Sequence, residues 1–377
     1  MTTKKMNIVR LAGIVIGFFG FIPGWAQTSP QRMLLALSKT DHTLAVVDPA
    51  SLKVIARLPV GTDPHEVIAS ADGTRAYVTI YGGGSLHELD ILDLVGLKAL
   101  PSYDTKPLFG PHGVVFEGGK VWYTAEGSKA IGRYDPATGQ TDLVLGTGQD
   151  RTHMIYVTPD GKRVYTTNVS SGTVSILVDT MIQPRMGPPP GAPGGAPGGG
   201  GAPGGAPGNP PGGAPGGGMP PPGPRAREDW SETVIPVSRG SEGFDVSPDG
   251  SELWTAASDD GSIAIIDVWG KRLVTKLDAH IQGANRLKFT PDGALVFVTS
   301  LGSGDLAIFD TKTRKEVKRL KIGHGAAGIL MDPVGGRAFV ACSADNYLAI
   351  VDLKSLEVTG RMDVGGVPDG LAWAVRP

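Results

Sequence analysis

Seven short stretches along the chain share one pattern: apolar and polar positions alternate, and each stretch closes on an aspartate that precedes a turn. Successive aspartates are 42 to 45 residues apart, except for one interval of 88 residues. Alternation with a period of two is typical of half-buried β-strands, and one unit recurring at this length is typical of a repeat architecture. The stretches end at Asp48, Asp90, Asp135, Asp179, Asp267, Asp310 and Asp352.

Each repeating unit contains four strand-like stretches, and the unit over residues 284–322 shows them most plainly. Its predicted strands are 284–290, 294–300, 306–310 and 315–322, and the turn Pro291-Asp292-Gly293 joins the first two. Short strands separated by tight turns predict one small antiparallel sheet for each unit.

The two ends of the chain each carry part of one further unit. Residues 364–375 match a first strand without a continuation, whereas 33–38, 43–48 and 53–60 match the second, third and fourth strands. Six whole units and one shared unit predict an all-β fold, a seven-bladed β-propeller of four-stranded antiparallel blades. Pairing of the N- and C-terminal strands would close this ring and protect the sheet edges.

Three repeats contain the runs TRAYVTIYGGGSLHELD, KRVYTTNVSSGTVSILVD and GRAFVACSADNYLAIVD. These runs resemble the YVTN-type repeat of seven-bladed β-propellers, a family that neighbours the lactonase-like propellers. The asparagine of the motif is kept at Asn168 and replaced by Ile80, Ser300 and Cys342. The resemblance implies an exported propeller, and it leaves the function open because such propellers range from binding scaffolds to enzyme subunits.

Two segments stand outside the repeat pattern. Residues 1–26 combine a basic start with an apolar run and end in a small residue, which predicts a secretory signal peptide; an uncleaved anchor is the alternative. Residues 183–227 are dominated by Gly and Pro, which predicts a disordered insert within the propeller that spans residues 31–377. We therefore expect a periplasmic or secreted protein with no membrane span after cleavage.

The charge of the chain limits the kinds of partner it can bind, and its cysteine content limits how the fold can be stabilised. The chain has 35 basic and 37 acidic residues and a formal net charge of −2, whereas a nucleic-acid-binding surface needs a basic stripe. We expect no nucleic-acid partner; instead we expect a small-molecule or protein partner in the cell envelope, and a monomer. The single cysteine, Cys342, excludes an internal disulfide, so stability must come from burial and sheet closure.

The histidines indicate where a ligand would bind. The order of strands in a propeller blade places all seven histidines on one face, and three of them start innermost strands around the mouth of the central channel. The ring at this position consists of His65, His112, His153, Glu242, Asn285, Ala327 and Asp369. The candidate ligand-binding residues are these ring residues apart from the alanine, together with Arg151, Arg239, His280 and His324 on the same face.

Three imidazoles in one ring are ligands that suit a divalent transition metal, so His65, His112 and His153 are a candidate metal site. The alternative is that these side chains only hydrogen-bond to neighbouring blades. The pattern favours a binding or scaffold protein. The alternatives are a lactonase-type hydrolase or isomerase, in which face histidines act as acid or base and Arg151 or Arg239 holds a carboxylate, and a metal-containing, redox-associated subunit.

Whether the chain is an enzyme stays open at this point. The sequence contains no G-x-S-x-G, Walker or H-E-x-x-H motif, and no residue is assigned a catalytic role.

Overall fold

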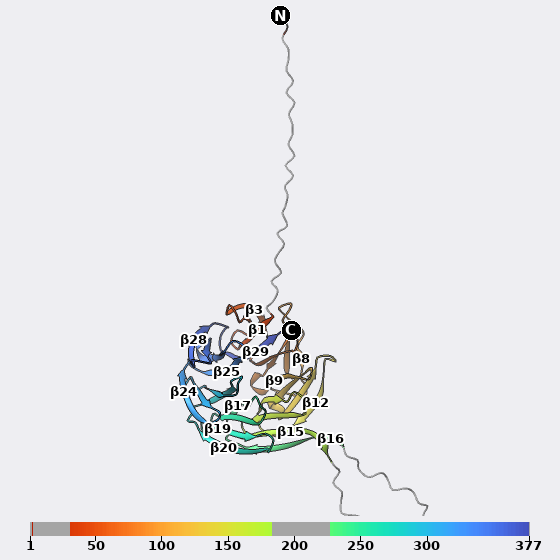
Figure 1. Ribbon diagram of the computed structural model, residues 1–377. Coiled ribbons are helices and arrows are strands. Elements are labelled where there is room, and N and C mark those ends of the chain that lie inside the picture. Colours follow the sequence, from red (N-terminus) through yellow and green to blue (C-terminus); the bar gives the residue numbers. More distant parts are fainter. Residues whose placement is uncertain (1, 3–30, 183–226, 377) are drawn as a thin grey trace, which may run out of the picture.

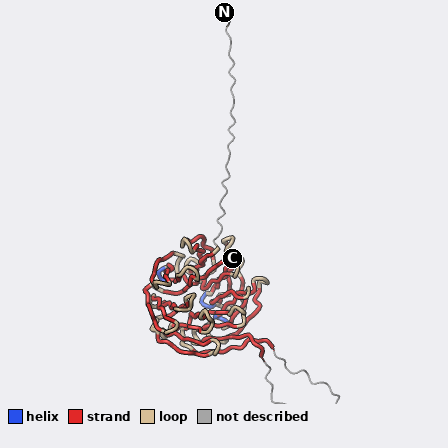
Figure 2. Tube along the Cα trace, viewed as in Figure 1, coloured by secondary structure: helices blue, strands red, loops and turns tan. Residues whose placement is uncertain are grey.

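The strands form seven small antiparallel sheets arranged in a ring, as Figure 1 shows. This computed structural model describes Thr2, residues 31–182 and residues 227–376. In these parts strands alternate with short turns (Figure 2), and helix is limited to three single 3-10 turns, η1 (Gly82–Gly84), η2 (Glu126–Ser128) and η3 (Ser343–Asp345). The predicted all-β seven-bladed propeller is confirmed. Apart from Thr2, the predicted signal peptide lies outside the described residues.

Six blades are built from strands that are consecutive in the chain, numbered from the centre of the ring outwards. In the first blade, β7 and β8 both pair with β6 and together take the place of one fourth strand. The strands of the first three blades are β4 (Pro64–Ala69), β5 (Arg75–Ile80), β6 (Glu88–Asp93), β7 (Lys98–Ala99) and β8 (Tyr103–Asp104); β9 (Pro111–Glu117), β10 (Lys120–Ala125), β11 (Ala130–Asp135) and β12 (Gln140–Gly146); β13 (Thr152–Val157), β14 (Arg163–Asn168), β15 (Thr173–Ile182) and β16 (Arg227–Pro236).

The next three blades keep the same order. Their strands are β17 (Ser241–Val246), β18 (Glu252–Ala257), β19 (Ser262–Asp267) and β20 (Arg272–Asp278); β21 (Ala284–Phe289), β22 (Leu295–Ser300), β23 (Asp305–Asp310) and β24 (Lys315–Lys321); β25 (Ala326–Asp332), β26 (Arg337–Cys342), β27 (Tyr347–Asp352) and β28 (Glu357–Met362).

The seventh blade joins the two ends of the chain, as the sequence predicts. Its strands are β29 (Pro368–Val375), β1 (Arg32–Ser38), β2 (Thr43–Asp48) and β3 (Lys53–Pro59), in that order from the centre. The C-terminal β29 is antiparallel to β1, with Arg32 opposite Val375 and Ala36 opposite Leu371. Closure by strand pairing removes the free edges that an open ring would expose.

One of the repeat aspartates is reassigned by the strand register. Asp93, rather than Asp90, occupies the repeat position in the first blade, because Asp93 lies opposite Arg75 just as Asp352 lies opposite Arg337. Asp93 accepts hydrogen bonds from two backbone N–H groups of the following turn. Asp90 instead accepts a hydrogen bond from the backbone N–H of Gly61.

The core lies between neighbouring blades. Alternate residues of each strand face the adjacent sheet, so apolar side chains from two blades interlock. Trp254 in β18 packs edge-on against Phe289 in β21 of the next blade, with ring centroids 5.9 Å apart, and both side chains are buried. The blades are thereby held in a fixed angular order, which also fixes the residues at the channel mouth.

The Gly/Pro-rich insert interrupts the longest hairpin of the ring. β15 and β16 pair without a break from Thr173 opposite Pro236 to Ile182 opposite Arg227. Arg227 is therefore the first residue of β16 and not part of the insert, which was predicted to span 183–227. Residues 183–226 lie outside the described residues.

Candidate functional site

The seven ring residues line one pocket of about 290 Å³ at the mouth of the central channel. Most of its lining residues are polar or charged, and its wall is completed by loops that follow the second strand of several blades. The residues around it are Lys39, His65, Tyr81, His112, Arg151, His153, Glu242, Asn285, Arg286, Leu301, Ala327, Ser343, Val367 and Asp369.

Threonines of the repeat hold the ring residues in place. The hydroxyl of Thr79 in β5 donates to the backbone carbonyl of His112 in the next blade, over 2.7 Å. Thr124 in β10 does the same to the carbonyl of His153. Since these threonines are buried, the bonds fix the start of each inner strand relative to its neighbour.

A close backbone approach between blades also depends on glycine. A Cβ atom on Gly113, next to His112, would lie 2.5 Å from the carbonyl oxygen of His153. A Cβ on Gly370, next to Asp369, would lie 2.4 Å from the carbonyl oxygen of His65. Glycine at these positions lets the inner strands come close enough for the ring side chains to converge.

The three ring histidines lie side by side in adjacent blades, with their ring planes tilted relative to one another. The ring centroids of His112 and His153 are 3.9 Å apart, and those of His65 and His112 are 4.6 Å apart. Burial lowers the pKa of His112 and of His153 well below the ordinary value, and each is lowered further by nearby positive charge. Both imidazoles are therefore neutral at pH 7.

Glu126, the first residue of η2, is the acidic neighbour of these histidines. Its Oε2 accepts a hydrogen bond from the hydroxyl of Tyr81 over 2.5 Å and one from Nε of Arg151 over 3.4 Å. Its Oε1 lies 3.7 Å from Nε2 of His153. Burial raises the pKa of Glu126, while the bonds from Tyr81 and Arg151 partly oppose this rise.

His65 differs from the other two because charged groups surround it. Its Nε2 lies 3.0 Å from Oδ1 of Asp63, and its Nδ1 lies 3.3 Å from Nζ of Lys39. Lys39 is itself paired with Asp369 at 2.9 Å. Burial lowers the pKa of His65 to about 4, against the opposing effect of Asp369.

A buried ion pair forms the floor of the pocket. Nη2 of Arg286 lies 2.7 Å from Oε1 of Glu66, and Nη1 lies 3.9 Å from Oε2 of Glu242. Asn285 also donates to Glu242. Below this layer the channel continues as a mainly apolar cavity, whose wall includes Phe244 and Trp373.

The remaining predicted face residues lie away from the pocket. Arg239 is exposed. His280 and His324 are each 81% exposed and lie beside Asp278 and Asp345, at 3.1 and 3.0 Å. Of the two arginines proposed as ligand anchors, only Arg151 borders the pocket.

Several pocket residues escaped the sequence reasoning. Tyr81 and Glu126 both follow the second strand of their blade, and Lys39 follows β1, the second strand of the closing blade. Loops that follow a second strand lie on the same face as the ring position. The sequence analysis assigned the histidines to this face, and the same assignment of acids, tyrosines and lysines would have identified these three residues. Arg286 directly follows the ring position Asn285.

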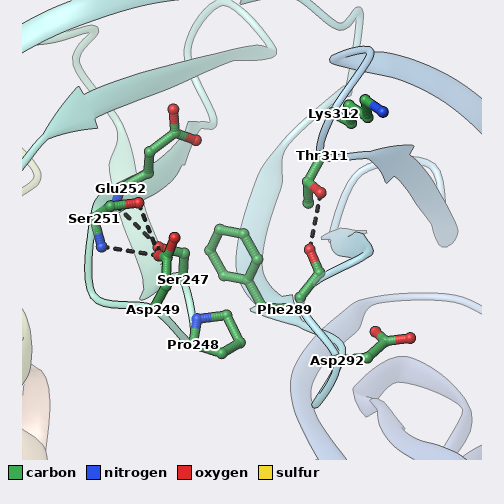
Figure 3. A pocket seen from close by; sticks show the side chains of 10 residues that line it. Ser247, Pro248, Asp249, Ser251, Glu252, Phe289, Asp292, Thr311 and Lys312 are labelled. Carbon is green, nitrogen blue, oxygen red and sulfur yellow. Dashed lines mark hydrogen bonds between the residues drawn. The ribbon is translucent and has the colours of Figure 1, made fainter.

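A second cleft, drawn in Figure 3, lies on the opposite face between two first-to-second-strand turns. Its carboxylates already have partners: Glu252 pairs with Arg314 at 2.7 Å, and the two aspartates are bonded within their own turns. Asp249 accepts hydrogen bonds from Ser247 and Ser251, and Asp292 accepts one from Thr290. This cleft therefore offers turn residues and no converging set of free polar groups.

No protein-family model matches the sequence, and no curated protein matches it. The fold is similar to candidate 6-phosphogluconolactonases from Bacteroides uniformis ATCC 8492 and Bacteroides fragilis NCTC 9343. The first has a TM-score of 0.66 and 15% identity, over 91% of this chain and 100% of that chain. The second has a TM-score of 0.65 and 15% identity, over 92% of this chain and 99% of that chain.

Hydrazine synthase from Kuenenia stuttgartiensis matches with a TM-score of 0.58 and 15% identity, over 82% of this chain and 89% of that chain. Dihydro-heme d1 dehydrogenase NirN in complex with DHE matches with a TM-score of 0.57 and 13% identity, over 88% of this chain and 63% of that chain. At such low identity these likenesses establish a propeller fold and carry no activity over to this chain.

Within residues 31–182 and 227–376, no helix is long and apolar enough to cross a membrane.

Proposed function

We propose that the protein is an exported, monomeric binding protein, and that its channel-mouth pocket holds a small molecule bearing a carboxylate or a phosphate. The observation that carries this proposal is the unused hydrogen-bonding capacity of the Arg151 guanidinium. Its Nε is engaged by Glu126, but no hydrogen bond joins its two terminal nitrogens to any described residue. The edge formed by these two terminal nitrogens is free, and it matches a carboxylate or a phosphate.

The remaining hydrogen-bonding capacity of the pocket cations, rather than their net charge, supports an anionic ligand. The cations along it are Lys39, Arg151 and Arg286, and the carboxylates are Glu242 and Asp369. Lys39 and Arg286 are already paired with acids, so Arg151 is the group with capacity for a new partner. Its backbone is fixed, because its carbonyl accepts a hydrogen bond from the N–H of Val169 over 3.0 Å.

The test is a binding screen with gluconate, 6-phosphogluconate, citrate and inorganic phosphate, followed by calorimetry. We expect at least one of these to bind the wild type and to bind the Arg151→Gln variant about tenfold or more weakly, since charge-assisted hydrogen bonds contribute about 1.5–3 kcal/mol. Arg239→Gln is the matched control, because Arg239 lies on the same face but outside the pocket. The proposal fails if no probe binds, or if both variants bind as the wild type does.

Lactone hydrolysis or isomerisation is a second candidate function, and one specific contact favours it. The neutral imidazole of His153 lies beside the Glu126 carboxylate, an arrangement in which the imidazole can accept a proton while the carboxylate stabilises the resulting charge. The candidate lactonases share almost their whole length with this fold. Turnover of a lactone panel that is lost in His153→Gln would establish it. The redox-associated alternative is supported only by fold similarity.

A further inference from the structure

We propose that His112, His153 and Glu126 bind one divalent transition-metal ion, with an open coordination position that faces the pocket. Each of these residues offers one ligand atom, and the three atoms lie within 4.8 Å of one another. Ligands bound at about 2.0–2.1 Å to a tetrahedral ion lie about 3.3 Å apart, so side-chain movements of about 1.5 Å at most would complete the site.

Unsatisfied polar atoms are the second, independent observation. Nδ1 of His112, Nδ1 of His153 and Oε1 of Glu126 are all buried and have no hydrogen-bond partner. Buried polar side-chain atoms nearly always have partners, and leaving one without costs about 1–3 kcal/mol. The unpartnered Oε1 of Glu126 faces Nε2 of His153 at 3.7 Å. A carboxylate oxygen and an imidazole nitrogen therefore converge on one position, where a metal cation can accept an electron pair from each.

The surroundings of Glu126 match those of a metal-binding carboxylate. Tyr81 and Arg151 bind Oε2 and leave Oε1 free to face the histidines. The ring of Tyr81 also packs edge-on against His112, with centroids 5.1 Å apart. Such outer contacts orient a ligand and limit its rotation.

His65 is excluded from the ligand set, although the sequence pattern had included it. Both of its ring nitrogens already lie next to charged groups, Asp63 and Lys39, and the ammonium of Lys39 would repel a cation. The proposed site thus differs from the predicted one in one member: Glu126 takes the place of His65.

The three ligand atoms also limit which metal ions the site would bind. Two imidazole nitrogens and one carboxylate oxygen suit Zn²⁺, Co²⁺, Ni²⁺ or Cu²⁺, whereas Mg²⁺ and Ca²⁺ prefer sites made of oxygen ligands. Three protein ligands leave a position for water or for a ligand atom from the pocket. The inference is independent of the anionic ligand proposed above, because it can be tested with metal alone.

The experiment uses the mature chain without a histidine tag, stripped of metal with EDTA and titrated with Zn²⁺ and with Co²⁺. We expect one ion per chain by calorimetry, visible absorption bands of bound Co²⁺ typical of low coordination number, and no binding of Mg²⁺. Outer-shell substitutions typically weaken metal binding by about 10–100-fold, so Tyr81→Phe should do so, and loss of a direct ligand in Glu126→Gln should exceed about 100-fold.

His65→Gln is the matched control, and it should leave the affinity for Zn²⁺ nearly unchanged. Thermal melting of the metal-free proteins shows whether each variant is folded; if Glu126→Gln is not, His112→Gln supplies the same comparison. The inference is overturned if the wild type binds neither Zn²⁺ nor Co²⁺. It is also overturned if His65→Gln loses binding while Glu126→Gln retains it, which would restore the three-histidine site.

Discussion

Thr124 in β10 donates its hydroxyl to the backbone carbonyl of His153 in the neighbouring blade, over 2.5 Å. The same hydroxyl accepts a hydrogen bond from the backbone N–H of Gly113, over 2.9 Å. One residue of the repeat motif therefore ties together its own blade, the next blade and the candidate site. The packing of the ring and the geometry of the pocket cannot be altered separately at this point.

Substitution of Thr124 by valine should lower the free energy of unfolding by about 1–3 kcal/mol, because valine keeps the shape but leaves two buried backbone groups without this partner. Chemical denaturation measures the change. Thr275→Val is the matched control: Thr275 is a half-buried residue of β20 whose hydroxyl bonds to no described residue, and its substitution should have little effect. An equal loss in both variants would contradict the assigned role of the inter-blade bond.

Ring closure should make the last strand essential. Deleting residues 365–377 removes β29, which would expose one edge of β1 and leave an open three-stranded blade. We expect aggregation or a large fall in the melting temperature. A truncated chain that melts within a few degrees of the full chain would show that the terminal strands do not close the ring.

The insert should be dispensable for folding, although it is longer than the deleted strand. β15 and β16 remain paired up to Ile182 and Arg227, so a short turn can join them. Replacing residues 187–223 by a short Gly/Ser loop should leave the melting temperature nearly unchanged, because closure entropy changes only slowly with loop length. A marked loss of stability would mean that the insert contributes contacts to the ring.

Asp332 should make stability depend on pH in the acid range. Burial alone would raise the pKa of this carboxyl, but hydrogen bonds from Arg32, from backbone N–H groups and from Arg337 hold it below its ordinary value of 3.8. Because the folded-state pKa is lowered, the stabilisation is complete above 3.8 and is lost as the pH falls through the folded-state value.

The corresponding measurement is urea denaturation of the wild type and Asp332→Asn over a series of pH values. Near pH 7 the variant should be less stable by about 3–5 kcal/mol, the usual cost of breaking a buried ion pair. The difference should shrink below pH 3.8. A difference that stays constant down to the lowest pH would rule out ionisation of Asp332 as its cause.

For the ion pair on the floor of the pocket, removing one partner should lower the free energy of unfolding more than replacing both partners by apolar residues. Arg286→Met leaves the Glu66 carboxylate buried without its partner and should destabilise the fold by about 3–5 kcal/mol. Adding Glu66→Leu should restore much of this loss, because the carboxylate paired most closely with Arg286 is then absent, while Glu242 keeps its hydrogen bond from Asn285. A double variant no more stable than Arg286→Met would show that the arginine acts through packing instead.

Most of the fold could be predicted because each blade is local in sequence. A strand of alternating residues, a turn with Gly or Asp and the next strand lie within one unit, so period and spacing identify them. The misassigned repeat aspartate shows the limit. Asp90 and Asp93 both end alternating runs, and only the pairing of β5 with β6 decides between them.

The candidate site could be predicted only in part, because it depends on the direction of side chains. The ring position followed from topology, and all of its members line the pocket. Which histidines keep unsatisfied nitrogens depends on neighbours such as Lys39 and Glu126, which come from loops of other strands. Spacing along the chain contains no information on those contacts.

The strand directions place four points of the described chain on one side of the ring: the start of β1, the end of β29, the end of β15 and the start of β16. β1 begins and β29 ends at the same end of their blade, with Arg32 opposite Val375, and β15 and β16 reach Ile182 and Arg227 on that side as well. The pocket opens on the other side. An affinity tag, a fused domain or a surface linkage at any of these points would therefore leave the pocket entrance unobstructed, so an immobilised protein could still be supplied with ligand from solution.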